Sequence, residues 1–215
     1  MSQNLTTQKR SAGVSGYIPN ELQPSQSSGV AGSDGSVKPH RCGAAGRALR
    51  VAYADPPYPG MSGFYKEHPD YAGEVDHEDL VKRLQTYDGW CLHTASTTLK
   101  YVLSLCPDDA RIMAWVKPFA AFKKHVAVAY AWEPVIVKPC RMRKYNGLTT
   151  VRDWCAESIT LQRGLTGVKP ETVCRWLFEA MGMQPHDELH DLFPGTGAVS
   201  IAWKKWKEQS CLTAA

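Results

Sequence analysis

The sequence has no long apolar run, no closely spaced cysteine pair and no strong excess of one charge. Its seven cysteines lie far apart among 215 residues, and none is part of a C-x-x-C pair. This spacing argues against a zinc-finger or dithiol redox protein, and His40 and Cys42 lack partners at ligand spacing, so we predict no metal site. No run approaches the roughly 20 apolar residues of a membrane helix, and the polar start lacks a signal-peptide core. We therefore expect a cytoplasmic protein with free thiols and no membrane contact.

The net charge of +4 permits a polyanionic partner without requiring one. Residues 1–47 are rich in Ser, Gly, Gln, Asn and Pro, which predicts a disordered N-terminal tail. The remaining residues, 48–210, are long enough for one domain with a substantial core.

Apolar strands alternate with amphipathic helices through this domain. We expect strands at 48–54, 90–94, 111–116 and 130–137, and helices at 76–88, 97–105 and 171–181. Glu133-Pro134 interrupts the 130–137 strand, which favours an edge position or a bulge there. The alternation predicts an α/β protein with a doubly wound, mostly parallel sheet.

The first chemically distinctive stretch is an apolar strand that ends in Asp55-Pro56-Pro57-Tyr58. The two prolines cannot continue a central strand, so the backbone must leave the sheet where Asp55 is presented. Ligands of open α/β sheets bind at the carboxyl ends of strands. The stretch therefore predicts a functional carboxylate at the edge of the sheet.

The second distinctive stretch runs from His190 to Trp203, where a short strand leads into a Gly-x-Gly turn and then a helix. Glycines allow a ligand to approach the backbone closely, and the first N–H groups of a helix attract an anion. The stretch lacks the lysine of a phosphate-binding Walker loop and the third glycine of the dinucleotide fingerprint. Alone, it predicts only a ligand turn.

Basic and aromatic side chains are mixed in an insertion at about 138–164. Cations that meet phosphate and rings that stack on bases are typical of nucleic-acid surfaces. An ordinary solvated insertion is the alternative. The candidate nucleic-acid-binding residues are Arg141, Arg143, Lys144, Tyr145 and Arg152.

Together, Asp-Pro-Pro-Tyr, the downstream Asp-x-Phe-x-Gly-x-Gly and the Lys169-Pro170 pair before it resemble the S-adenosylmethionine-dependent amino-methyltransferases of DNA. The order of the motifs resembles the permuted beta class, and the likeness covers about 48–203. Such enzymes methylate N6 of adenine or N4 of cytosine. The resemblance implies a Rossmann-like methyltransferase fold, S-adenosylmethionine as cofactor and DNA as partner.

The resemblance also implies roles for single residues. Asp55 and the carbonyl of Pro56 would accept the two hydrogens of the target amine, Pro57 completes the motif, and Tyr58 would stack on the flipped base. Trp115 and Lys117 are expected to close a strand beside the catalytic one and to line its pocket. The residues implied in cofactor binding are Lys169, Pro170, Asp191, Phe193, Gly195, Thr196 and Gly197.

The carboxyl end departs from the family pattern. Family members usually continue with a strand that ends in an acidic residue, whereas this chain has Lys204 to Glu208 there. We expect a sheet that lacks two strands on one side. The adenosine half of the pocket is then either open or completed by a second copy or another partner protein.

The leading hypothesis is a site-specific DNA methyltransferase, specific for adenine N6, in the cytoplasm of a bacterial or phage-infected cell. Two alternatives stay open. One is a degenerate, non-catalytic methyltransferase-fold module that binds nucleic acid or a partner. The other is methylation of RNA adenine, for which a related group carries Trp where this chain has Tyr58.

Overall fold

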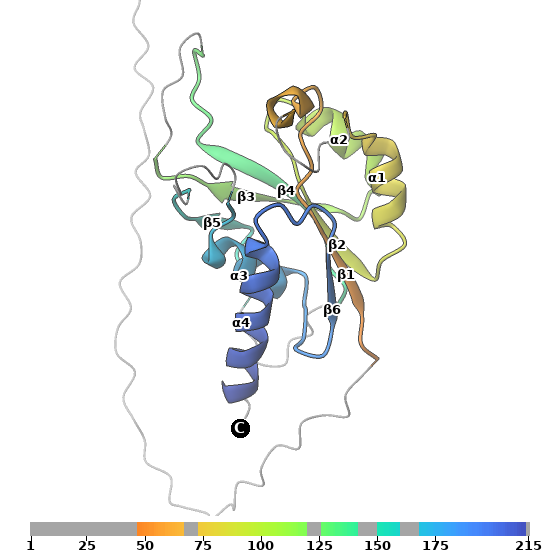
Figure 1. Cartoon of the computed structure of the whole chain (residues 1–215), viewed down its shortest axis with the longest axis vertical. Helices are drawn as coiled ribbons and strands as arrows, with labels where there is room; N and C mark the ends of the chain where they lie inside the picture. The colour runs from red at the N-terminus through yellow and green to blue at the C-terminus, as the bar shows by residue number, and fades with distance from the viewer. Residues whose placement is uncertain (1–46, 67–72, 120–125, 142–149, 160–167, 214–215) are drawn as a thin grey trace, which may run out of the picture. The chain divides into compact units, whose positions relative to one another are not determined.

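The structure is a computed structural model, and it describes residues 47–66, 73–119, 126–141, 150–159 and 168–213 (Figure 1). The expected tail, residues 1–47, lies outside these ranges apart from Arg47. The elements in chain order are β1 Arg50–Ala54, η1 Ser62–Tyr65, α1 His77–Leu84, β2 Gly89–His93, α2 Leu99–Leu105, β3 Arg111–Val116, β4 Trp132–Lys138, β5 Trp154–Ala156, α3 Glu171–Ala180, β6 Glu188–Asp191 and α4 Ala198–Thr213.

The six strands form one sheet in the order β5-β3-β4-β2-β1-β6. The pairs β1–β2, β1–β6 and β3–β5 are parallel, whereas β4 runs antiparallel to both of its neighbours. Five strands therefore run in one direction, which confirms the predicted α/β fold with a mostly parallel sheet.

The prediction of an edge position or bulge for the fourth strand is wrong. β4 lies between β2 and β3 and pairs with both. The Pro134 carbonyl accepts a hydrogen bond from the N–H of Thr94, the residue after β2, so the Pro134 nitrogen also faces Thr94. The proline therefore costs one ladder bond, to the Thr94 carbonyl, and this bond lies beyond the last residue of β2.

Alternate residues of the central strands enter different hydrophobic cores. On one face Val51 and Tyr53 of β1 pack with α3 and α4, and on the other Ala52 and Ala54 pack with α1 and α2. Figure 1 shows these two helix pairs on opposite sides of the sheet. β1 and β2 are buried on both faces, as the continuous apolar runs of parallel strands require.

Local signals explain several boundaries. The Asp76 carboxylate accepts the N–H groups of Glu78 and Asp79, so it caps α1 as the sequence predicts. Pro170 is extended, with ψ of 142°, and its carbonyl accepts the N–H of Val173 at the start of α3. None of the helices in the described ranges is both long and apolar enough to span a bilayer.

One element, β5, was not expected, whereas β6 and α4 match the short strand and the helix predicted on either side of the glycine turn. β5 forms within the basic insertion, where we expected no regular element, and it pairs with the edge of β3. In the part of the chain that the structure describes, β6 pairs with β1 alone and α4 continues as a single helix to Thr213. β6 is thus an edge strand on the side where two strands were expected to be lacking.

Candidate active site

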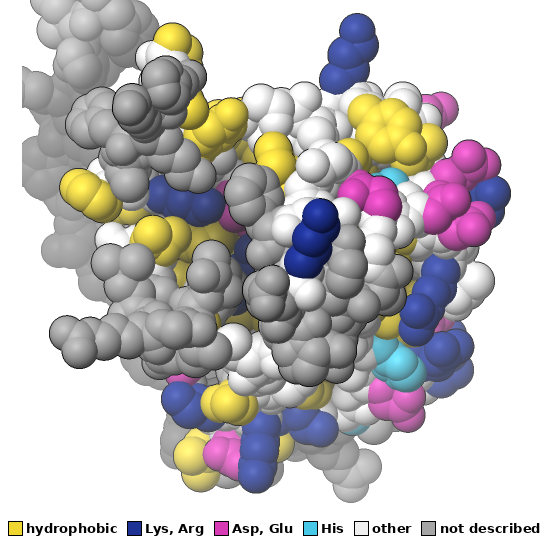
Figure 2. Space-filling view, turned by 45° about the horizontal axis from the view of Figure 1, so that its top comes forward, with side chains coloured by type: hydrophobic (Ala, Val, Ile, Leu, Met, Phe, Trp, Pro, Cys, Tyr) yellow, Lys and Arg dark blue, Asp and Glu magenta, His cyan; other side chains and the backbone are white. Residues whose placement is uncertain are grey.

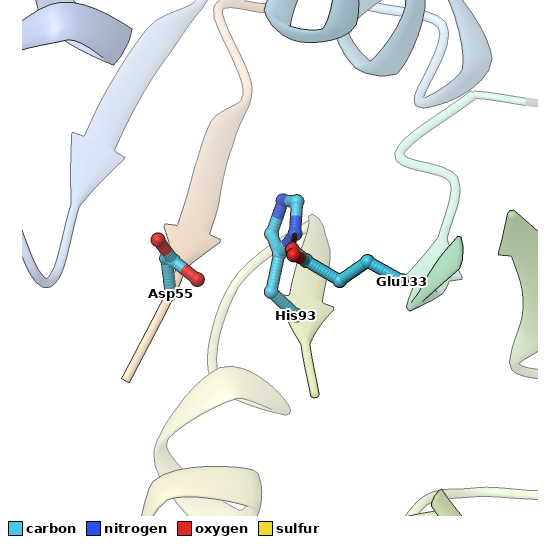
Figure 3. Close-up of side chains that lie close together, drawn as sticks. All are labelled: Asp55, His93 and Glu133. Carbon is cyan, nitrogen blue, oxygen red and sulfur yellow. Dashed lines mark hydrogen bonds and ion pairs between the residues drawn. The ribbon is translucent and has the colours of Figure 1, made fainter. Parts of the chain in front are cut away.

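At one edge of the sheet, where the parallel strands have their carboxyl ends, acidic and imidazole side chains from three neighbouring strands lie together. Asp55 follows the last residue of β1, and His93 is the last residue of β2. Because β4 runs in the opposite direction, its second residue, Glu133, reaches the same edge. Figure 3 shows the three side chains converging between these strands.

His93 connects two buried partners. Its Nδ1 lies 2.7 Å from Glu133 Oε1, and its Nε2 lies 2.7 Å from the hydroxyl of Tyr53. A neutral imidazole satisfies both contacts, because Nδ1–H can donate to the carboxylate while Nε2 accepts from the hydroxyl. Burial, followed by the nearby thiols Cys174 and Cys91, raises the pKa of Tyr53 well above its ordinary value, so the hydroxyl keeps its proton.

Lys169 enters this cluster from the residue before Pro170, the N-cap of α3. Its Nζ lies 2.8 Å from Glu133 Oε1 and 3.1 Å from Asp55 Oδ1, and its side chain is 6% exposed. Burial acts to lower the pKa of Lys169, but the charges of Asp55 and Glu133 outweigh it and raise the pKa above the ordinary value. The side chain is therefore an ammonium that bridges two carboxylates.

Glu133 is the most heavily bonded member of the cluster. Besides His93 and Lys169, it accepts a hydrogen bond at Oε2 from Lys117 Nζ at 2.8 Å. Burial opposes ionisation, but the Lys169 charge and the His93 hydrogen bond hold the pKa of Glu133 well below its usual range. Glu133 is thus an ionised, fixed anchor rather than a free acid.

The ligand atoms of Asp55, His93 and Glu133 lie within 4.8 Å of one another, which is also a possible donor set for a metal ion. The Lys169 ammonium, however, already bridges the two carboxylates of this set. The two carboxylates are matched by the ammonium groups of Lys169 and Lys117. The position between Asp55 and Glu133 is therefore already occupied by a cation.

The structure brings the glycine turn next to the proline-rich turn. β6 is parallel to β1 with Asp191 opposite Tyr53, so the residues after both strands leave the same edge side by side. Gly195 and Gly197 have φ of 44° and 73°, which favours glycine, and they lead directly into α4.

Asp191 has an unused oxygen. Its Oδ1 accepts the N–H of Phe193 at 3.3 Å, whereas Oδ2 is buried and has no hydrogen-bond partner among the described residues. Burial raises the pKa of Asp191 to about 6, the Phe193 N–H acts against this shift, and the charge of Asp55 adds to it. A buried acceptor without a donor is costly, so this carboxylate suits a ligand that donates a hydrogen bond or carries positive charge.

The other predicted ligand residues border the same edge. Pro56 is buried, and Pro57 and Tyr58 are partly exposed. Phe193 packs against the core on the α1 and α2 side, whereas Thr196 is exposed at the tip of the glycine turn.

The two predicted nucleic-acid residues that the structure describes, Arg141 and Arg152, do not lie at this edge. Arg141 follows β4 at the opposite edge of the sheet, where its guanidinium pairs with the fully buried Asp187 through contacts of 2.5 and 2.8 Å. Arg152 lies 5.5 Å from the ring centre of Trp154, near the outer strand β5. The other three, Arg143, Lys144 and Tyr145, lie outside the described residues. On the face shown in Figure 2, the described Lys and Arg side chains are interspersed with acidic ones.

Sequence reasoning missed Tyr53, His93 and Glu133. Each stands in an apolar strand, where a buried polar side chain needs a partner, and this was the signal available. The expected place of Trp115 and Lys117 was also wrong, because β4 and β2 separate β3 from β1. Their side chains nevertheless reach the cluster: Lys117 bonds Glu133, and the Lys169 ammonium lies 5.2 Å from the Trp115 ring centre.

No family model matches the chain, and the search of curated proteins found no similar sequence. Among solved structures, the chain is similar to the M1.HpyAVI-SAM complex, with 13% identity and a TM-score of 0.49, over 78% of this chain and 87% of that one. A structure of M1.HpyAVI has 14% identity and a TM-score of 0.41, over 74% of this chain and 77% of that one. Both likenesses are distant.

Proposed function

We propose that the protein is an S-adenosylmethionine-dependent methyltransferase that acts on the exocyclic amine of a flipped DNA base, most directly N6 of adenine. One observation carries the proposal. The Asp-Pro-Pro-Tyr carboxylate Asp55 and the carboxylate Asp191, whose Oδ2 has no partner among the described residues, lie at the same ends of neighbouring parallel strands. Asp55 would accept a hydrogen bond from the target amine, and Asp191 would accept one from the cofactor beside it.

The chemistry of the target explains the acceptors around Asp55. The lone pair of an exocyclic base amine is delocalised into the ring, which makes the nitrogen a poor nucleophile. Asp55 and the Pro56 carbonyl would accept the two N–H groups, draw the nitrogen toward a tetrahedral geometry and aim its lone pair. Tyr58 would stack on the flipped base.

The residues of the glycine turn fit the cofactor. Among the described residues, no donor contacts the buried Oδ2 of Asp191. The ammonium of the methionine portion would supply the missing donor. Gly195 and Gly197 leave the backbone bare, and the first N–H groups of α4 suit the methionine carboxylate. Phe193, Thr196 and Pro170 would border the ligand. When bound, S-adenosylmethionine supplies the methyl group that the amine accepts.

Fewer residues support the proposed contact with DNA. Arg141 is held by Asp187, so we assign phosphate contact first to Arg152, with Arg143, Lys144 and Tyr145 as further candidates. The open edge of β6 is where a second copy or another protein would complete the adenosine side of the pocket.

The test is methyl transfer from tritiated S-adenosylmethionine to duplex DNA, single-stranded DNA and RNA, with mass spectrometry of the digested nucleosides. We expect N6-methyladenine in DNA from the parent protein, and loss of product with Asp55→Ala. Asp108→Ala is the matched control, because Asp108 is an exposed carboxylate on the loop after α2. This control should match the parent.

Each alternative has its own outcome. Label in RNA alone would identify an RNA methyltransferase. Formation of N4-methylcytosine would identify cytosine instead of adenine as the target base. Cofactor or DNA binding by calorimetry without any product would favour a non-catalytic module. Equal labelling by the parent and Asp55→Ala would overturn the proposed site.

A further inference from the structure

The charge of Lys169 is directed at the sheet edge rather than at the glycine turn. Its ammonium touches Asp55 and Glu133 and lies 5.2 Å from the ring centre of Trp115. We propose that Lys169 is a positioning residue, which fixes the Asp55 carboxylate for the target amine while Glu133 holds Lys169 in place. The proposal rests on the proposed function and gives Lys169 a role other than cofactor contact.

The backbone at Lys169 aims the side chain at the cluster. Residues before proline favour extended conformations, and Lys169 directly precedes Pro170, the N-cap of α3. The Lys169 side chain is buried, so packing around its methylene groups restricts the positions that the ammonium can take. A long, flexible side chain is thereby limited to one position.

Glu133 holds the Lys169 ammonium through a contact that does not involve Asp55. Its Oε1 is shared by Lys169 at 2.8 Å and His93 at 2.7 Å, and its Oε2 is taken by Lys117 at 2.8 Å. Tyr53 fixes the far side of the imidazole. Every link in this chain of contacts is a short bond within a buried region, which suits precise placement.

The arrangement divides the two oxygens of Asp55 between two tasks. Oδ1 lies 3.1 Å from Lys169 Nζ, and the Asp55 side chain is 24% exposed. The ion pair orients the carboxylate, while its exposed part is left for the amine hydrogen. A misplacement of about 1 Å at such an acceptor lowers turnover by roughly 100-fold without an equal loss of binding.

Turnover separates positioning from a general structural role. Lys169→Met should lower kcat roughly 10- to 100-fold, with KM for DNA and cofactor changed less than about threefold. Lys169→Arg keeps a cation and should recover part of the loss. Lys205→Met is the matched control, since Lys205 pairs with Glu171 on the surface, and it should behave as the parent. Parent-like kcat in Lys169→Met would overturn the proposal.

A second readout needs no activity. It is the position of the Asp55 carboxylate in crystal structures of the variants. Lys169→Met should turn this carboxylate away from its parent position, because the 3.1 Å contact with Lys169 Nζ is lost. Lys117→Met should leave Asp55 in place, because Lys117 pairs with Glu133 and not with Asp55.

The two readouts can fail separately. An inactive parent protein would count against the proposed function, while the structures of the variants would still test the contact. An unchanged Asp55 carboxylate in folded Lys169→Met would overturn the positioning role. If that variant does not fold, Glu133→Gln decides: it removes the charge that holds Lys169 in place, so the Lys169 ammonium and the Asp55 carboxylate should both shift. An unchanged position of both groups would again overturn the proposal.

Discussion

The buried, unpartnered oxygen of Asp191 predicts a variant that gains stability and loses ligand binding. Asp191→Asn removes the charge and keeps an oxygen that can accept the Phe193 N–H. Burial raises the pKa of Asp191 from 3.8 to about 6, which means that the folded protein disfavours its ionised form. The free energy of unfolding is therefore reduced above pH 6, and the cost disappears as the pH falls below the unfolded pKa of about 3.9.

The magnitude follows from this shift. At about 1.36 kcal/mol per pKa unit the full cost would be about 3 kcal/mol, and because Asp191 is only partly buried we discount this to about 1 kcal/mol. For a domain of this size about 1 kcal/mol corresponds to a Tm change of about 2–4 °C. Asp191→Asn should raise Tm by this amount at about pH 8 and leave it unchanged at about pH 4.

Differential scanning fluorimetry over this pH range is the assay, with Asp108→Asn as an exposed control. Calorimetry of the same variant should show cofactor affinity reduced by about 1.5–3 kcal/mol, roughly 10- to 150-fold, because a charged hydrogen bond is lost. A pH-independent change of Tm, or a lower Tm at about pH 8, would refute the assignment of an uncompensated carboxylate.

Three further predictions concern other parts of the molecule. Arg141→Ala should lower the free energy of unfolding by about 1.5–3 kcal/mol in urea titrations, because it removes the counter-ion of the buried Asp187 and leaves this carboxylate only the N–H groups of Leu49 and Gln184, yet it should not change the salt dependence of DNA binding. Gly197→Ala, at φ of 73°, should cost about 1 kcal/mol in the same titration and weaken cofactor binding. Dialysis against a chelator should change neither Tm nor product formation, because Lys169 already occupies the cation position between Asp55 and Glu133.

Patterns of local order were predictable from the sequence. The buried strand before Asp55, the helix cap at Asp76 and the glycine turn after Asp191 all depend on residues that are neighbours in the chain. Their periodicity and turn chemistry are readable without tertiary information. The sequence therefore predicted both ends of the candidate site.

The connection between those ends was not predictable in the same way. Glu133 stands 78 positions after Asp55 and reaches it through Lys169, a further 36 positions on, so its partners depend on the order and direction of the strands. Pro134 suggested an edge strand, but its nitrogen faces Thr94, just after β2, so the single lost bond lies at the end of the ladder. Side-chain contacts between distant segments carry no signal in local periodicity.

The reversed direction of β4 has a consequence for how such a protein can vary. A helical crossover from β3 would have returned the chain to the far end of the strands, whereas the hairpin between β3 and β4, closed by the bond from Lys117 N–H to the Ala131 carbonyl, opens at the end of the sheet that carries Asp55 and His93. Insertions in this hairpin would change the surroundings of these side chains while the sheet register and Glu133 stay in place. Under the proposed function, the hairpin is accordingly a place where a new substrate preference could be introduced at little cost to the fold.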